Sequence, residues 1–162
     1  MISVIPYEEK HLDSMVEIWN EVVREGLAFP QTEPLDKESG RAFFKEQTCS
    51  CVALDGDSGQ VLGLYILHPN NVGRCGHICN ASYAVASAHR GGGIGERLVR
   101  DCLKRGKDCG FTILQFNAVV ASNQRARRLY ERLGFVPLGV IPRGFRLDDG
   151  RYEDICPYYI EL

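Results

Sequence analysis

The hydrophobic positions of this chain follow two different periods along its length. In Glu9–Arg24 apolar residues recur at helical spacing, which predicts an amphipathic helix that ends before Gly26. In Ile94–Gly106 the same spacing predicts a second long helix with one buried stripe. Between and after these helices lie short runs rich in β-branched and aromatic residues, which predict strands.

The predicted elements follow one another without a repeat, a low-complexity tract or a linker, so we expect a single domain over residues 1–162. The predicted strands are Ile2–Pro6, Ser50–Leu54, Gln60–Leu67, His77–Ala86, Thr112–Ala121, Phe135–Ile141 and Tyr152–Leu162. The predicted helices are Glu9–Arg24, Lys37–Gln47, Ile94–Gly106 and Gln124–Leu133. The alternation of strand and helix in the second half predicts an α/β fold, with a mixed sheet and helices on both faces.

The composition favours a globular protein, since 44% of its 162 residues are hydrophobic and 25% are charged. No apolar run approaches about 18 residues, so we expect no membrane-spanning helix and no membrane partner. The first ten residues carry Glu8 and Glu9 and lack the features of a signal peptide, so we expect a cytoplasmic location. The net charge of −2 argues against a nucleic-acid partner.

The charge is unevenly distributed along the chain. Residues 1–89 carry a net charge of −6 and residues 90–162 carry +4, with the change at Arg90. Two interpretations stay open: the second half binds an anionic ligand, or its basic residues simply cover solvated helices. Seven cysteines are an odd number without zinc-like spacing, so we expect small buried side chains, no disulfide framework and no metal.

A glycine-rich loop lies between the predicted strand ending at Ala86 and the helix starting at Ile94. Glycines can adopt positive φ and let backbone N–H groups approach a phosphate closely. The N-terminus of the following helix adds unpaired N–H groups and the positive end of its dipole, and Arg90 can add charge-assisted hydrogen bonds. The segment therefore predicts an anion cradle.

Two common phosphate-binding motifs do not fit this loop. The dinucleotide fingerprint G-x-G-x-x-G requires a final glycine where the chain has Glu96 or Leu98. The nucleotide P-loop requires Gly-Lys-Ser/Thr, which does not occur in the chain.

The loop does match Q/R-x-x-G-x-G/A, as Arg90-x-x-Gly93-x-Gly95. Downstream, the chain also has the pattern N-x-x-A-x-x-L-Y-x-x-x-G-F, from Asn123 through Tyr130 to Phe135. Through these two linked motifs the chain resembles the GNAT superfamily of N-acetyltransferases. The resemblance covers about Cys79–Phe135 and implies a mixed, mostly antiparallel central sheet whose central strands splay apart.

The resemblance implies that acetyl-CoA, without a metal, lies in the gap between the splayed strands. Backbone groups of Tyr83, Ala84 and Val85 would pair with the pantetheine arm, and Asn123 would both cap its helix and contact CoA. The residues that would hold the pyrophosphate are Arg90, Gly91, Gly92, Gly93, Ile94 and Gly95.

The resemblance also implies direct transfer of the acetyl group to an amine. The Val85 amide would polarise the thioester carbonyl, and the Tyr130 hydroxyl would serve the leaving sulfur, unless Tyr130 is only a core aromatic residue. No carboxylate occurs in Ile78–Ala86, so we expect deprotonation through water, or an amine that arrives neutral. His77 is either a relay for this proton or a structural histidine.

A narrower resemblance concerns the amine. Asn80, Asn117 and Asn123 lie in segments similar to those of the fungal proline-analogue (azetidine-2-carboxylate) acetyltransferases. This implies that Asn80 and Asn117 bind an amino-acid-like acceptor, whereas the alternative is that they satisfy backbone groups where the strands splay.

Three functions stay open from the sequence. The first is acetylation of a small-molecule amine, the second is acetylation of a protein N-terminus or lysine, and the third is non-catalytic binding of acyl-CoA. The presence of both motifs favours catalysis. The resemblance also allows a homodimer.

Overall fold

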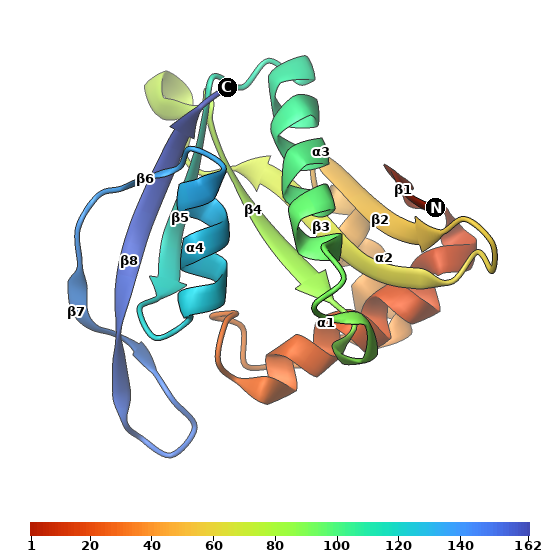
Figure 1. Ribbon diagram of the computed structural model, residues 1–162, viewed down its shortest axis with the longest axis horizontal. Coiled ribbons are helices and arrows are strands. Elements are labelled where there is room, and N and C mark those ends of the chain that lie inside the picture. Colours follow the sequence, from red (N-terminus) through yellow and green to blue (C-terminus); the bar gives the residue numbers. More distant parts are fainter.

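The computed structural model describes residues 1–162 and contains one eight-stranded sheet with helices on both faces (Figure 1). The strands are β1 (Ile2–Pro6), β2 (Cys49–Asp55), β3 (Val61–Pro69), β4 (Ile78–Val85), β5 (Ile113–Val120), β6 (Val136–Pro137), β7 (Ile141–Arg146) and β8 (Tyr152–Glu161). The helices are α1 (Leu12–Glu25), α2 (Lys37–Glu46), α3 (Ile94–Asp108) and α4 (Gln124–Arg132). Short 3₁₀ turns are η1 (Glu9–His11), η2 (Gly73–Cys75) and η3 (Ser87–His89).

The strand order in the sheet is β1-β2-β3-β4-β5-β8-β6, and β7 pairs with β8. The pair β4–β5 is parallel, whereas every other pair is antiparallel. A parallel pair needs a long crossover, and here the crossover carries the glycine loop and α3. The expectation of a mixed, mostly antiparallel sheet is confirmed.

The two faces of the sheet bury two separate hydrophobic cores, because side chains alternate along each strand. On one face, Leu98 and Cys102 of α3 pack with Tyr65 and Tyr158 of the sheet. On the other face, α1 and α2 pack against alternate residues of β2 and β3 (Figure 1). The predicted placement of helices on both faces is therefore confirmed.

The connection between α1 and α2 is fixed to the second core. The Trp19 and Phe29 rings lie 4.4 Å apart between centroids. Asn20, a buried polar residue, donates from Nδ2 to the Leu35 carbonyl oxygen over 2.7 Å, and its Oδ1 accepts from the Leu35 N–H over 2.8 Å. An asparagine that satisfies both a donor and an acceptor of one distant residue holds this connection against the helix.

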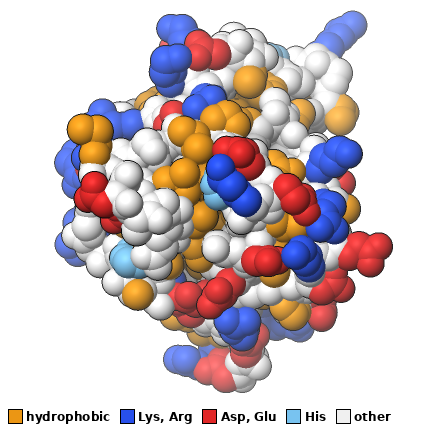
Figure 2. All heavy atoms as spheres, turned by 90° about the vertical axis from the view of Figure 1, so that its right-hand side faces the viewer, with side chains coloured by type: hydrophobic (Ala, Val, Ile, Leu, Met, Phe, Trp, Pro, Cys, Tyr) orange, Lys and Arg blue, Asp and Glu red, His pale blue; other side chains and the backbone are white.

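The surface carries interspersed charges. On the side of the molecule that includes the N-terminus, Lys and Arg side chains lie next to Asp and Glu side chains instead of forming a patch of one sign (Figure 2). Along α3, Arg100, Lys104 and Arg105 each pair with a carboxylate four residues away. For this helix, the interpretation that basic residues cover a solvated surface is correct. No helix combines the length and the apolar character needed to cross a bilayer.

Two predicted elements differ from the structure. The predicted strand Phe135–Ile141 is wrong: only Val136–Pro137 pairs there, and a separate strand β7 follows from Ile141. Pro137 lacks an N–H and Gly139 has a φ of 132°, so a continuous ladder cannot form. The helix predicted from Glu9 begins as the 3₁₀ turn η1, because the Glu8 N–H donates to His11 Nδ1.

Candidate active site

The strands β4 and β5 separate in the middle of the sheet. They pair only at Ile78–Ile113 and Cys79–Leu114, after which β5 continues along β8. The Ala86 N–H donates to Leu62 of β3, so the N–H and C=O groups of the alternate residues Tyr83 and Val85 face the opposite way, toward β5. The splay therefore leaves part of a backbone edge without a partner strand.

Side chains satisfy two of these backbone groups. Asn80 Oδ1 accepts from the Ala81 N–H over 2.8 Å, and Arg90 Nε donates to the Val85 carbonyl oxygen over 3.2 Å. The N–H groups of Tyr83 and Val85 remain free to pair with an extended ligand. The end of β4 thus has the open backbone edge that a ligand would need in order to pair with it, as the sequence led us to expect.

The glycine loop follows β4 and η3 directly. Gly91 and Gly93 have φ values of 92° and 78°, a left-handed conformation that favours glycine, and Gly93 is the N-cap of α3. No side chain caps this helix, so the N–H groups of its first turn face outward. Ile94 is buried beneath the loop and anchors it to the core.

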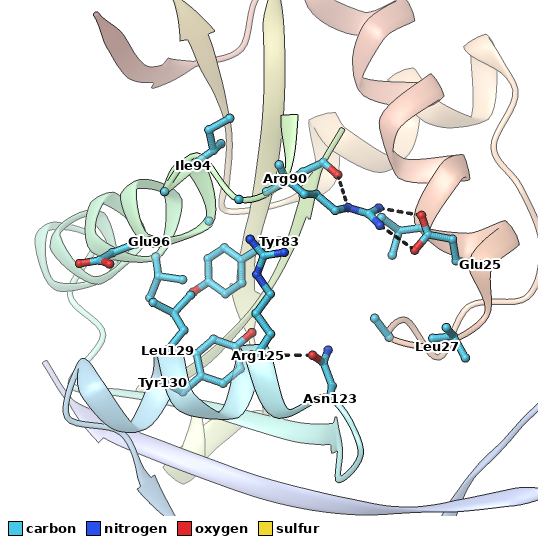
Figure 3. A pocket seen from close by; sticks show the side chains of 18 of the residues that line it. Glu25, Leu27, Tyr83, Arg90, Ile94, Glu96, Asn123, Arg125, Leu129 and Tyr130 are labelled. Atoms are coloured by element: carbon cyan, nitrogen blue, oxygen red, sulfur yellow. Dashed lines mark hydrogen bonds and ion pairs between the residues drawn. The ribbon is translucent and has the colours of Figure 1, made fainter. Parts of the chain in front are cut away.

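A cavity of about 570 Å³ opens over this loop, between α3, α4 and the end of α1 (Figure 3). It brings together most of the residues that the sequence assigned to cofactor binding: Tyr83, Val85, Arg90, Gly91, Gly93, Ile94, Gly95, Asn123 and Tyr130. Asn123 Oδ1 accepts from the Ala126 N–H over 3.2 Å and caps α4, as expected. Ala84 and Gly92 do not line the cavity. Ala84 is buried in the core on the α1 face of the sheet, and Gly92 is exposed within the loop.

The cations in this cavity differ from the sequence expectation. The Arg90 side chain, expected to contact phosphate, instead forms a two-point ion pair with Glu25 of α1 over 2.7 and 3.1 Å. This pair raises the pKa of Arg90 and directs its guanidinium away from the loop (Figure 3). Glu21, also on α1, accepts from the Ser87 N–H over 2.7 Å. Arg90 therefore attaches the loop to α1.

The unpaired cation is Arg125 on α4. Arg132 in the same cavity pairs with Glu96, whereas Arg125 takes part in no ion pair. Its Nη2 lies 3.6 Å from the position that a Cβ on Gly91 would occupy. Sequence reasoning missed Arg125, because it is one of the variable positions of the second motif.

A second cavity of about 290 Å³ lies at the gap and is bordered by the connection after α1. It meets the first cavity at the residues that line both, which are Ala28, Tyr83, Asn123, Ala126 and Tyr130. The two cavities thus approach one point between β4 and β5 from different sides.

Two tyrosines occupy this meeting point. The Tyr130 ring packs at a tilt against Phe116, with centroids 4.5 Å apart, and burial raises the pKa of its hydroxyl. Burial also raises the pKa of Tyr83 well above its usual value, and the Tyr83 hydroxyl is the one buried side-chain polar atom without a hydrogen-bond partner. Tyr130 is therefore both a packed aromatic residue and a residue of the cavity wall.

The structure also brings Asn80 and Asn117 together in the wall of the second cavity. Both donate to Oδ1 of Asn70, a residue of the loop after β3 that sequence reasoning missed. No Asp, Glu, Lys, Arg or His lines this cavity. His77 is exposed and lies outside both cavities, so the expectation of a relay at His77 has no geometric basis.

An open cradle of N–H groups, a free strand edge and two converging cavities thus lie together where β4 and β5 separate. The Acetyltransferase (GNAT) family model matches residues 12–135. The chain therefore belongs to the GNAT acetyltransferase family.

Individual relatives agree with this assignment. The N-acetyltransferase aca1 of Schizosaccharomyces pombe is 35% identical over 136 residues, which are 72% of this chain and 65% of that protein. The chain thus spans slightly less than two thirds of that relative. The structure of an N-acetyltransferase from Kribbella flavida has a TM-score of 0.90 and 31% identity, covering 99% of this chain and 98% of that one.

A phosphinothricin acetyltransferase from Sinorhizobium meliloti, solved with acetyl-CoA, has the same fold. Its TM-score is 0.91 with 22% identity, and the match covers 99% of this chain and 88% of that one.

Proposed function

We propose that this protein transfers an acetyl group from acetyl-CoA directly to the amine of a small molecule, and that the acceptor is an amino acid or a proline analogue. The observation that carries the proposal is the meeting of two cavities at Tyr83 and Tyr130, through the gap between β4 and β5. Two substrates that enter from different sides can react there without a covalent enzyme intermediate.

The larger cavity suits two parts of acetyl-CoA, the diphosphate and the pantetheine arm. The first turn of α3 and the free Arg125 suit the diphosphate. The open edge at Tyr83 and Val85 suits the amides of the pantetheine arm. The acetyl-CoA in the structure of the S. meliloti protein, which shares this fold, agrees with the proposal.

Acetyl-CoA supplies an activated thioester, and residues at the gap stabilise the negative charges that develop on its carbonyl oxygen and its sulfur during cleavage. When the amine nitrogen bonds to the carbonyl carbon and the C–S bond breaks, the Val85 N–H is placed to stabilise the negative carbonyl oxygen. The Tyr130 hydroxyl is protonated at neutral pH, as tyrosines ordinarily are, and burial raises its pKa further; it donates a hydrogen bond to the departing thiolate, which takes its proton from water. The proton of the amine leaves to water, because no carboxylate or histidine lines the acceptor cavity.

The acceptor cavity favours a small molecule. Its volume of about 290 Å³ suits an amino acid better than a long side chain with its backbone. Asn80 and Asn117 offer neutral donors to an acceptor oxygen.

Release of free thiol from acetyl-CoA tests the proposed reaction directly. With L-azetidine-2-carboxylate or another small amino acid we expect steady thiol release and an N-acetylated product by mass spectrometry. Release only with N-terminal or lysine peptides would overturn the proposed acceptor class, and CoA binding without release for any amine would overturn the proposed catalysis.

Substitution of Gly93 by valine should abolish binding of CoA while the protein remains folded. Position 93 needs a φ of 78°, and the added side chain would fill the space of the diphosphate. Gly110→Val is a matched control, since Gly110 has a φ of 91° and equally open surroundings but lies at the far end of α3. Calorimetric CoA titration and circular dichroism check both variants. Equal CoA affinity in the two variants would contradict the cradle.

Substitution of Arg125 by alanine should weaken CoA binding about tenfold, because a charge-assisted hydrogen bond is lost. The wild-type affinity should fall as salt is added, and this dependence should be weaker in the variant. Arg128→Ala, which removes an exposed arginine of the same helix outside the cavity, should leave the affinity unchanged. If Arg125→Ala and Arg128→Ala bind CoA with the same affinity and the same salt dependence, Arg125 is not the phosphate contact.

Substitution of Tyr130 by phenylalanine should lower kcat by about tenfold or more, because the departing thiolate loses its hydrogen-bond donor. The ring packing against Phe116 is retained, so affinity for CoA should stay within about twofold. Steady-state and single-turnover kinetics of Tyr130→Phe check this. The control variant is Tyr152→Phe, which removes the hydroxyl of an exposed tyrosine outside both cavities and should keep the wild-type rate. A kcat close to that of the wild type would remove Tyr130 from the chemistry.

A further inference from the structure

The wall of the acceptor cavity depends on a residue that does not line it. Asn70 follows β3 directly, and its N–H donates to the Ile78 carbonyl oxygen over 2.8 Å. Its Oδ1 accepts from Asn117 Nδ2 over 2.7 Å and from Asn80 Nδ2 over 3.3 Å. One amide oxygen therefore connects β4 and β5 just beyond the point where their pairing ends.

The hydrogen-bond network fixes which way each amide points. Asn80 Oδ1 is occupied by the Ala81 N–H, so the Asn80 atom that faces Asn70 is the NH₂ group. Asn117 Oδ1 accepts from Gln115 Nε2 over 3.0 Å, so the NH₂ group of Asn117 also faces Asn70. Exchanging oxygen and nitrogen in either amide would place like groups together.

Each NH₂ group retains one unused hydrogen. An amide nitrogen carries two hydrogens, and Asn70 takes one from each partner. Each carbonyl oxygen already accepts one hydrogen bond, and the second hydrogens are the donors that Asn80 and Asn117 can offer to the cavity. With no charged side chain in the lining, an acceptor oxygen is left to neutral donors, and beside Ser82 and Asn123 these two amides offer a converging pair whose orientation matters.

We propose that Asn70 is a positioning residue that sets acceptor specificity, by holding the amides of Asn80 and Asn117 with one donor each turned toward the acceptor. The inference rests on the proposed function, because the acceptor is taken from it. Without Asn70 each side chain keeps one hydrogen bond at its Oδ1 but loses the partner that fixes its NH₂ group, and binding would bear the cost of ordering that group.

Kinetics with two matched acceptors test this role. L-azetidine-2-carboxylate carries oxygens for the two amides, whereas azetidine is the same ring without them. In Asn70→Ala we expect KM for L-azetidine-2-carboxylate to rise about tenfold over the wild-type value. KM for acetyl-CoA, and both kcat and KM for azetidine, should stay within about twofold of the wild-type values. Asn71→Ala is the control, since Asn71 is exposed and bonds only to the adjacent Val72 N–H.

A double variant separates positioning from general stability. If Asn70 acts through Asn117, adding Asn70→Ala to Asn117→Ala should change KM for L-azetidine-2-carboxylate much less than it does in the wild type. Equal effects in both backgrounds, or a parallel loss with azetidine, would overturn the inference and leave a structural role.

Binding measured without turnover keeps the inference separate from the proposed function. With CoA present, L-azetidine-2-carboxylate should shift the side-chain NH₂ resonances of Asn80 and Asn117 in ¹⁵N–¹H spectra, and azetidine should not. Asn70→Ala should abolish these shifts, and unchanged shifts would refute its role.

If the wild type acetylates both acceptors equally, the inference about Asn70 fails while the acetyltransferase proposal stands. If CoA does not bind at all, the acetyltransferase proposal fails.

Discussion

The site depends on one constraint, which is that the parallel pairing of β4 and β5 stops after Cys79 and Leu114. Backbone N–H and C=O groups beyond that point need other partners, because leaving them buried and unpaired costs free energy. Asn80 satisfies the Ala81 N–H and Arg90 satisfies the Val85 carbonyl. The groups that no side chain satisfies are the ones available to a ligand, so an interruption in the sheet becomes a binding edge.

The same interruption determines how charge is arranged around the cofactor cavity. Arg90 bonds to the end of β4 and to Glu25, so α1, β4 and the glycine loop are connected through one guanidinium. The ion pair with Glu25 neutralises the charge of Arg90. The positive field toward the loop then comes from the α3 N-terminus and from Arg125, which approaches from α4. The positive groups that face the cavity beside the loop therefore make no ion pair within the protein.

The sequence predicted much of the fold, because helix and strand periods are local properties. Two of its failures concern groups whose partners are distant along the chain, and a third concerns local signals. The motif identified Arg90 as a cation near the loop, but its partner Glu25 is 65 residues away. Asn70 lay in a predicted loop, and nothing in its neighbours indicated that Asn80 and Asn117 would converge on it. The misplaced strand at Phe135–Ile141 had local signals in Pro137 and Gly139, which hydrophobicity outweighed.

The acceptor cavity owes its shape to a segment outside both family motifs. Ala28, Phe29 and Pro30 border it, and they belong to the connection that follows α1. This connection is held by the Trp19–Phe29 contact and by the reciprocal bonds between Asn20 and Leu35, while Gly26 at its start approaches Asp148 of the β7–β8 turn. These contacts hold the wall in position from several sides. The glycine loop and α4 thus carry the two family motifs, while the α1–α2 connection and the Asn70 network give the second cavity the features particular to this chain.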